Sequence, residues 1–161
     1  MATDIFLKLD GLDGESSDHA HEKEIDVLSW SWGMTQSGSM HVAKGGGAGK
    51  ANVGDLQLTK YIDSATVNLK KSCCSGKQFP TATLVCRKAG GDDPVEYYKI
   101  EMKNVIISSV QVGGAQSDDR LVETVSLNFG EYTSTYTPQD NEGKAGAEIT
   151  GGHNMQTNKP H

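Results

Sequence analysis

Features that mark nucleic-acid-binding proteins, membrane proteins or secreted precursors are scarce in this sequence of 161 residues. Its 15 basic residues are outnumbered by 21 acidic ones, so it lacks the clustered Lys and Arg that bind a phosphate backbone. No apolar run is long enough to cross a bilayer, and the opening MATDIFLKLDG has no basic segment followed by an apolar one. We therefore expect no nucleic-acid partner, no membrane insertion and no cleaved signal peptide.

Cysteine is also rare. The chain has three cysteines, of which Cys73 and Cys74 are adjacent and Cys86 stands alone. An odd number with two neighbours is not a disulfide framework, and it is typical of a chain that folds in a reducing cytoplasm. The sequence leaves open whether Cys73 or Cys74 later links one copy of the chain to another.

A phosphate-binding loop is the first chemical motif to test, because GGGAGKA at residues 45–51 is rich in glycine and contains Gly-Lys. A Walker A loop places glycine five residues before Gly-Lys and a hydroxyl directly after it. Here those positions hold Lys44 and Ala51, and the segment lies among predicted strands, not between a strand and a helix. We interpret the segment as a long loop and expect no nucleotide cofactor.

Metal and nucleophile motifs are equally incomplete. His19 and His21 lie in HAHEKE beside two glutamates, but no second cluster supplies further ligands. Cys73 falls on the apolar face of an expected helix and has no evident histidine partner. We expect no metal, no cofactor and no catalytic residue, and hence no enzyme; a small β enzyme built around His19 and His21 is the alternative.

The chain does contain segments in which large apolar residues alternate with small or polar ones, most clearly EIDVLSWSWGM at residues 24–34. Alternation with period two is typical of a strand with one buried face. One face is large and apolar, the other small and mostly polar, so we interpret Trp30 and Trp32 as core residues. The apolar face would carry Leu28, Trp30, Trp32 and Met34, and the small face Val27, Ser29, Ser31 and Gly33.

Further strands are predicted along most of the chain, including a long run at 95–112 that we expect to bend near Asn104. A single helix is expected over Ser64–Ser75, capped by Ser64 and ended by Gly76. The fold class is therefore mainly β: an antiparallel or two-sheet β-barrel with one flanking helix, in one domain over residues 1–161. Alternating apolar positions are Ile5, Leu7, Leu9, Leu56, Leu58, Leu121, Val125, Leu127 and Phe129, with Glu123 interrupting the last series. The tail from about residue 139 is weakly patterned, and a final strand there stays an open question.

The chain resembles the haemolysin-coregulated protein family, Hcp, the tube-forming component of bacterial type VI secretion systems. The resemblance covers nearly the whole length and is carried by DIFLKLDGLDGES, HEKEIDVLSWSWGMTQSGS, DLQLTKYIDSATVNL, VEYYKIEMKNVIISSVQVGG and DRLVETVSLNFGEYTSTYTPQ. It implies a hexameric ring, rings stacked into a tube, and expulsion by a contractile sheath together with tip proteins. It also implies export from the bacterial cytoplasm to the outside or a target cell, with small effector proteins held in the lumen.

The same resemblance assigns expected roles to two segments. Ser29 and Ser31 would line the lumen and contact effectors. The loop after the tryptophan segment would contact the next ring through Ser39, Met40, His41, Val42, Lys44, Gly45, Gly46, Gly47, Gly49 and Lys50. Two rival functions remain: a phage-tail-tube-like structural protein, and a ligand-binding β-sandwich module, which the absence of aromatic residues on loops disfavours.

Overall fold

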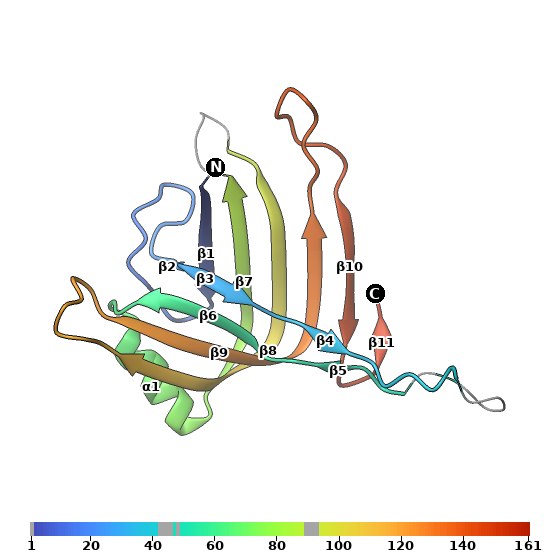
Figure 1. Cartoon of the computed structure of the whole chain (residues 1–161), viewed down its shortest axis with the longest axis horizontal. Helices are drawn as coiled ribbons and strands as arrows, with labels where there is room; N and C mark the ends of the chain where they lie inside the picture. Colours follow the sequence, from blue (N-terminus) through green and yellow to red (C-terminus); the bar gives the residue numbers. More distant parts are fainter. Residues whose placement is uncertain (1, 42–46, 48, 89–93) are drawn as a thin grey trace.

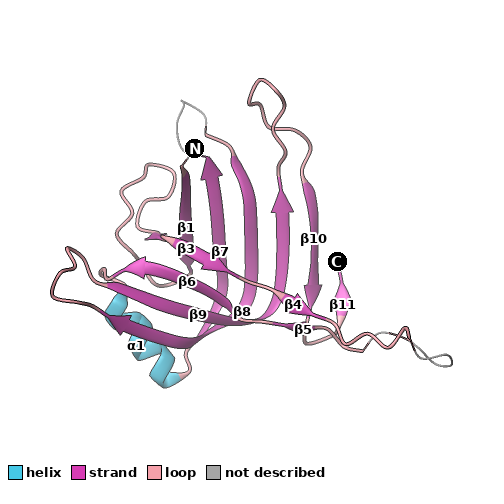
Figure 2. Cartoon of the chain, viewed as in Figure 1, coloured by secondary structure: helices cyan, strands magenta, loops and turns pink. Residues whose placement is uncertain are grey.

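The computed structural model describes residues 2–41, 47, 49–88 and 94–161, and these residues form a mainly β structure with one helix (Figures 1 and 2). All strand pairs are antiparallel, which confirms the predicted fold class. The elements are β1 (Thr3–Leu9), β2 (Ile25–Asp26), β3 (Ser29–Ser31), β4 (Met34–Thr35), β5 (Asn52–Val53), β6 (Leu56–Tyr61), α1 (Thr66–Ser75), β7 (Gln78–Lys88), β8 (Glu96–Gly113), β9 (Val122–Tyr136), β10 (Ile149–Asn154) and β11 (Lys159–Pro160).

Two sheets share the long strands β8 and β9. Sheet I has the order β2-β1-β7-β8-β9-β10-β11, and sheet II has the order β3-β6-β9-β8. β9 pairs with β6 through its first half and with β10 through its second half. Figure 1 shows the consequence: the strands of sheet I stand upright, and those of sheet II cross in front of them. The sheets thus form an incompletely closed barrel with a core between them.

The turn from one sheet to the other is made near Asn104, as the sequence predicts. Asn104 has φ of 55°, a left-handed conformation that asparagine adopts more readily than most residues. The pairing of β8 with β9 continues from Lys103↔Glu131 to Val105↔Phe129, and a register shift follows between Ile107 and Ser109. These irregularities bend both strands, as bulges do.

The core is filled from both sheets and from α1. The predicted alternation of apolar positions is confirmed in β6, where Leu56 and Leu58 are buried, and in β9, where Val125, Leu127 and Phe129 are buried; Ser126 is buried as well. Core residues include Leu7, Leu84, Ile100 and Met102 from sheet I, Leu56, Leu58, Val125 and Leu127 from sheet II, and Ala65 and Leu69 from the helix region. Leu121 is exposed, because it precedes β9 in the connecting turn.

The tryptophan segment differs from the single strand expected, because it passes between the sheets. The Val27 amide donates to Ile5 of sheet I, whereas the next amide, Leu28, donates to Thr59 of sheet II. The segment is therefore split into β2, β3 and β4. Val27 is 8% exposed and Leu28 46% exposed, the reverse of the predicted faces. The period-two prediction was wrong at this crossing.

Beyond the crossing, both tryptophans are half-buried and pack against the core. Trp30 stacks on Tyr98 with ring centroids 5.8 Å apart. Trp32 meets Tyr132 edge-on at 4.8 Å, and its Nε1 donates to the Gly54 carbonyl at 3.0 Å. They therefore close the edge of the core and are not at its centre.

The helix begins later than predicted. Ser64 is exposed, and the carboxylate of Asp63 accepts the Ala65 amide at 2.9 Å, so Ser64 is not the cap. Gly76 ends the helix in the left-handed conformation, with φ of 67°, as predicted.

The open question of the tail is answered by β10 and β11, since β10 pairs with β9 from Ile149 to Asn154. Alternation is weak there because two of its positions are glycine. A Cβ on Gly152 would lie 2.1 Å from the Tyr132 carbonyl oxygen, so only glycine fits.

Candidate functional site

The outward face of sheet II is the surface with the most distinctive composition. Residues directly opposite one another on neighbouring antiparallel strands share a face, so the register defines two rows across the four strands. One row is Ser29, Thr59, Thr124 and Gln111; the other is Ser31, Gln57, Ser126 and Ser109. All eight side chains are polar and uncharged.

The orientation of these rows follows from the row between them, which is Trp30, Leu58, Val125 and Val110. Those four belong to the core or pack against it. Because successive residues of a strand point to opposite faces, the two polar rows face away from the core. Ser29 and Ser31 thus lie on an exposed face, at the β3 end of the rows.

Among the described residues, charged side chains lie at the two ends of this surface. Asp55 precedes β6 and accepts hydrogen bonds from Ser108 and Asn128, both at 2.7 Å. Near the other end of β6, the guanidinium of Arg120 lies 3.8 Å from the centre of the Tyr61 ring. We name the two rows the neutral face of sheet II.

The outward face of sheet I is different, because charged side chains are spread along it. It carries Lys8, Lys99, Glu101, Lys103 and Glu131, as the register across β1, β7, β8 and β9 shows. Lys99 and Glu101 form an exposed pair at 3.3 Å. The two outer faces of one chain therefore suit different surroundings.

Sheet II also has two unpaired edges. Within the described residues, β3 pairs only with β6, and β8 beyond Ile107 pairs only with β9. Unpaired strand edges offer free backbone donors and acceptors, which another chain can satisfy.

Beneath the neutral face, Lys60 and Glu123 form a buried ion pair between β6 and β9. The ammonium of Lys60 also donates to Asp63 at 2.8 Å, and the hydroxyl of Thr66 donates to Glu123 at 2.9 Å. These contacts join sheet II to the start of α1. The sequence shows Glu123 only as a break in an apolar series, so its partner could not be identified there.

The His19–Glu24 segment, considered above for metal binding, packs against sheet I instead. The imidazole of His21 is buried, with Nδ1 2.5 Å from Glu24 and Nε2 2.6 Å from Glu96, and it stacks on Phe6. His19 and Glu22 are exposed. Both ring nitrogens of His21 are therefore occupied by carboxylates.

Arg87 of β7 also holds the connection between β1 and β2, through ion pairs. The guanidinium of Arg87 donates to Asp18 at 2.6 Å and to Asp4 at 3.0 Å. Hydrogen bonding to Arg87 holds the pKa of the Asp18 carboxyl well below its usual range, and raises the pKa of Arg87. Asp18 thus remains ionised and fixes the loop onto β7.

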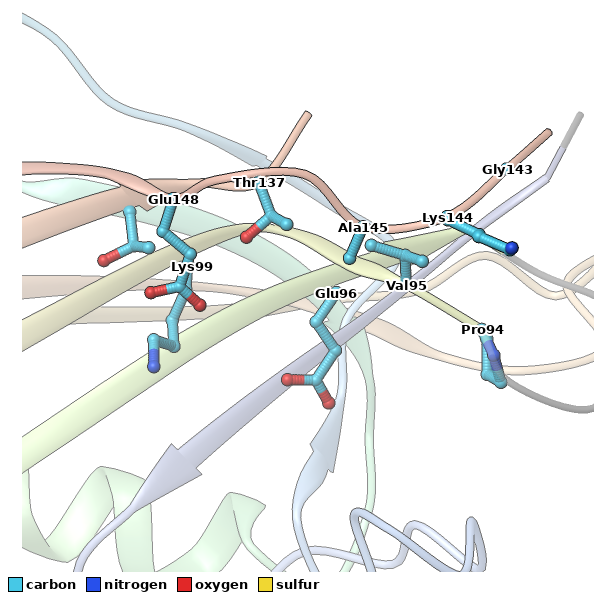
Figure 3. A pocket seen from close by; sticks show the side chains of 10 residues that line it. Pro94, Val95, Glu96, Lys99, Thr137, Gly143, Lys144, Ala145 and Glu148 are labelled. Atoms are coloured by element: carbon cyan, nitrogen blue, oxygen red, sulfur yellow. The ribbon is translucent and has the colours of Figure 1, made fainter. Parts of the chain in front are cut away.

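Figure 3 shows a pocket of about 470 Å³ between the start of β8 and the β9–β10 connection. Lys99, Glu148, Lys144 and Thr137 line it, and Glu96 is shared with His21. No nucleophile there contacts a base among the described residues, so the pocket gives no reaction to assign. Among residues 2–41, 47, 49–88 and 94–161, no helix is long and apolar enough to span a membrane.

The loop expected to contact a neighbouring ring is only partly described. β4 and β5 pair as a ribbon that extends beyond both sheets (Figure 1), and Met40, which lies between these strands in the sequence, is 80% exposed. Val42, Lys44, Gly45 and Gly46 lie outside the described residues. Ser39, His41, Gly47, Gly49 and Lys50 are described, and the amide of Ser39 donates to the Gly47 carbonyl at 3.1 Å. Cys74 is exposed and Cys73 half-buried, both on α1.

Known proteins resemble the chain over its whole length. The family described as "Type VI secretion system effector, Hcp" matches residues 6–136. Protein hcp1 of Pseudomonas aeruginosa is 53% identical over 159 residues, which is 98% of each chain. A solved type six secretion system protein matches with a TM-score of 0.93 at 37% identity, covering 99% of this chain and all of the other. Hcp1 of Salmonella typhimurium matches with a TM-score of 0.82 at 40% identity over the full length of both chains. The chain belongs to the Hcp family of the type VI secretion system.

Proposed function

We propose that copies of this chain close into a hexameric ring, and that rings stack into a tube with the neutral face of sheet II lining the lumen. The tube is a structural part of the secretion apparatus, not an enzyme. It is made in the bacterial cytoplasm, held by sheath and tip proteins, and expelled with small effector proteins inside.

The composition of the neutral face is the observation that carries this proposal. A passage for varied proteins needs a wall that neither attracts nor repels charge strongly and has no large side chain to obstruct it. Ser29, Ser31 and the six residues in register with them have this chemistry. The charged outer face of sheet I suits the outside of the tube.

The edges of sheet II support ring formation. The sheet has the antiparallel order β3-β6-β9-β8, so β3 and β8 run in opposite directions. If β3 of one copy lies beside β8 of the next, the antiparallel pattern continues around the ring. Such a ring leaves neither edge of sheet II exposed.

The β4–β5 ribbon supports stacking. It extends away from both sheets (Figure 1), and Met40, which lies between β4 and β5, is 80% exposed in the part of the chain that the structure describes. Contact with the neighbouring ring would cover it. A phage-tail-tube-like protein would share this design, but the family match favours the type VI apparatus.

Native mass measurement combined with negative-stain electron microscopy tests the proposal. We expect a hexamer with an open centre, and stacks of rings at high protein concentration. A chain that stays monomeric at high concentration would contradict it.

A further inference from the structure

A second pocket, of about 320 Å³, lies between α1 and the turn that follows β1. Gly11 and Leu12 of the turn line one side; Gly11 has φ of 89°, and the Leu12 amide donates to the Leu9 carbonyl at 3.0 Å. Small-molecule sites have volumes of about 300–1,000 Å³, so this pocket is large enough for a small ligand. The rest of the lining comes from one face of α1 and the residues after it: Asn68, Lys71, Ser72, Ser75 and Lys77.

The lining of this pocket is positively charged. It contains Lys71 and Lys77 and no carboxylate. Within the described residues neither lysine forms an ion pair. Asp10 and Asp13 flank the turn in the sequence, but both are exposed and neither belongs to the lining. An anion in the pocket would therefore meet two ammonium groups whose charge is not already paired.

Ser72 supplies an observation that does not depend on the lysines. Its side chain lines the pocket although the residue is only 5% exposed, and among the described residues its hydroxyl makes no hydrogen bond. Serine within a helix often donates to the carbonyl one turn earlier, and a buried hydroxyl without a partner is costly. An anionic oxygen in the pocket would accept the hydrogen bond that Ser72 lacks.

The end of α1 does not oppose an anion as strongly as the end of a helix usually does. Free carbonyl groups at a helix C-terminus carry negative partial charge. Here the Ser72 carbonyl accepts the Lys77 amide at 3.2 Å and the Ser75 hydroxyl at 3.4 Å. The lining therefore presents donors to a ligand: the two ammonium groups, the Ser72 hydroxyl and the side-chain amide of Asn68.

We propose that this pocket binds a small molecule with two negative charges, either a phosphate monoester or a dicarboxylate. Lys71 and Lys77 balance its charge, and Ser72 donates to one of its oxygens. Leu12, which is 6% exposed, gives the pocket an apolar wall. The bound ligand joins the end of α1 to the turn after β1. This inference is independent of the proposed ring, and so is its test.

Inorganic phosphate is the probe, and the width of its phosphorus NMR line reports binding whether the chain is monomeric or assembled. The titration is run at constant ionic strength and mildly alkaline pH. Lys71→Gln with Lys77→Gln is expected to weaken binding roughly tenfold or more, because two charge-assisted hydrogen bonds are lost. Lys144→Gln with Lys159→Gln removes the same charge from exposed positions outside the pocket and is expected to leave binding unchanged.

Ser72→Ala separates a built site from general attraction to positive charge, because it leaves the net charge unaltered. Phosphate binding is expected to weaken roughly threefold or more through the lost hydrogen bond. Without phosphate, the free energy of unfolding should not fall, since the hydroxyl has no partner to lose among the described residues. A purely structural role for Ser72 would leave phosphate binding unchanged.

Competition identifies the class of ligand. Displacement of phosphate by glycerol phosphate indicates phosphate esters, and displacement by malonate indicates dicarboxylates; either result supports the pocket. If phosphate does not bind, or binds the unaltered chain and all three variants equally, it is an adventitious ion only and the inference is overturned. Binding that survives Ser72→Ala and the loss of Lys71 and Lys77 unchanged overturns it as well.

Discussion

Lys60 and Glu123 face each other across β6 and β9 with no exposed surface on either side chain. The pair lies in the core, where Leu58 and Val125 occupy the neighbouring inward row. Lys60 also donates to the backbone carbonyl of Tyr61 at 2.9 Å. Two opposite charges are thus held inside the protein where sheet II meets α1.

Removing one partner of this pair should be costly. Glu123→Leu leaves the Lys60 ammonium buried with Asp63 as its remaining carboxylate, and we expect a loss of about 3–5 kcal/mol in the free energy of unfolding. Adding Lys60→Met should recover much of that loss, because no buried charge remains unpaired. Urea unfolding measures the free energy of unfolding of the unaltered chain, the Glu123→Leu variant and the double variant. Glu101→Gln, which breaks the exposed pair with Lys99, serves as the control and should cost at most about 1 kcal/mol. Equal losses for Glu123→Leu and Glu101→Gln would contradict this account.

Alternation alone places the apolar residues of β6 and of the first half of β9, because one face of each strand is buried against the other sheet. Alternation fails at Val27 and Leu28, whose amides donate to Ile5 of sheet I and to Thr59 of sheet II. These contacts depend on how the two sheets pack, and the residues next to Val27 and Leu28 in the sequence do not indicate them. Ser29 and Ser31 can be assigned from the sequence to a face opposite Trp30. The six residues that complete their rows become visible only through the strand register.

Acid should weaken the attachment of the loop between β1 and β2. The pKa of Asp18 in the folded chain lies below its ordinary value of 3.8 because Arg87 donates to the carboxylate. A carboxyl with a lowered folded pKa contributes stability that is complete above its ordinary pKa and is lost as the pH falls toward the folded value. Asp18→Asn should therefore lower the free energy of unfolding at neutral pH and flatten its decline in acid. Thermal unfolding across that pH range measures both, and an unchanged acid slope would argue against the pair.

Gly152 should not tolerate a side chain, whereas Gly151 beside it should. An added Cβ at Gly152 meets the Tyr132 carbonyl at 2.1 Å, but at Gly151 the nearest atom is 3.9 Å away. We expect Gly152→Ala to cost about 1–3 kcal/mol through displacement of β10 from β9. Gly151→Ala should stay within about 0.5 kcal/mol, as surface substitutions usually do. Chemical denaturation compares the two, and equal stability of both variants would show that β10 is not held in this register.

Shortening the ribbon between β4 and β5 separates stacking from ring formation. Deletion of residues 45–49 removes length from the ribbon end, while both edges of sheet II remain. We expect the hexamer to persist in native mass spectra and stacks to become shorter in electron micrographs. Stacks of unchanged length would remove the ribbon from the contact between rings.

Effector retention should depend on the neutral face. Ser31→Arg adds a long charged side chain to a row that otherwise consists of Gln57, Ser126 and Ser109, so it narrows the lumen and introduces charge. Effector recovered with the purified ring should fall, while the hexamer persists because the backbone edge of β3 is unchanged. Thr81→Arg adds the same side chain at an exposed position of β7 on the outer face of sheet I and should leave recovery unaltered. If both variants retain effector equally, the neutral face is not the surface that effectors contact.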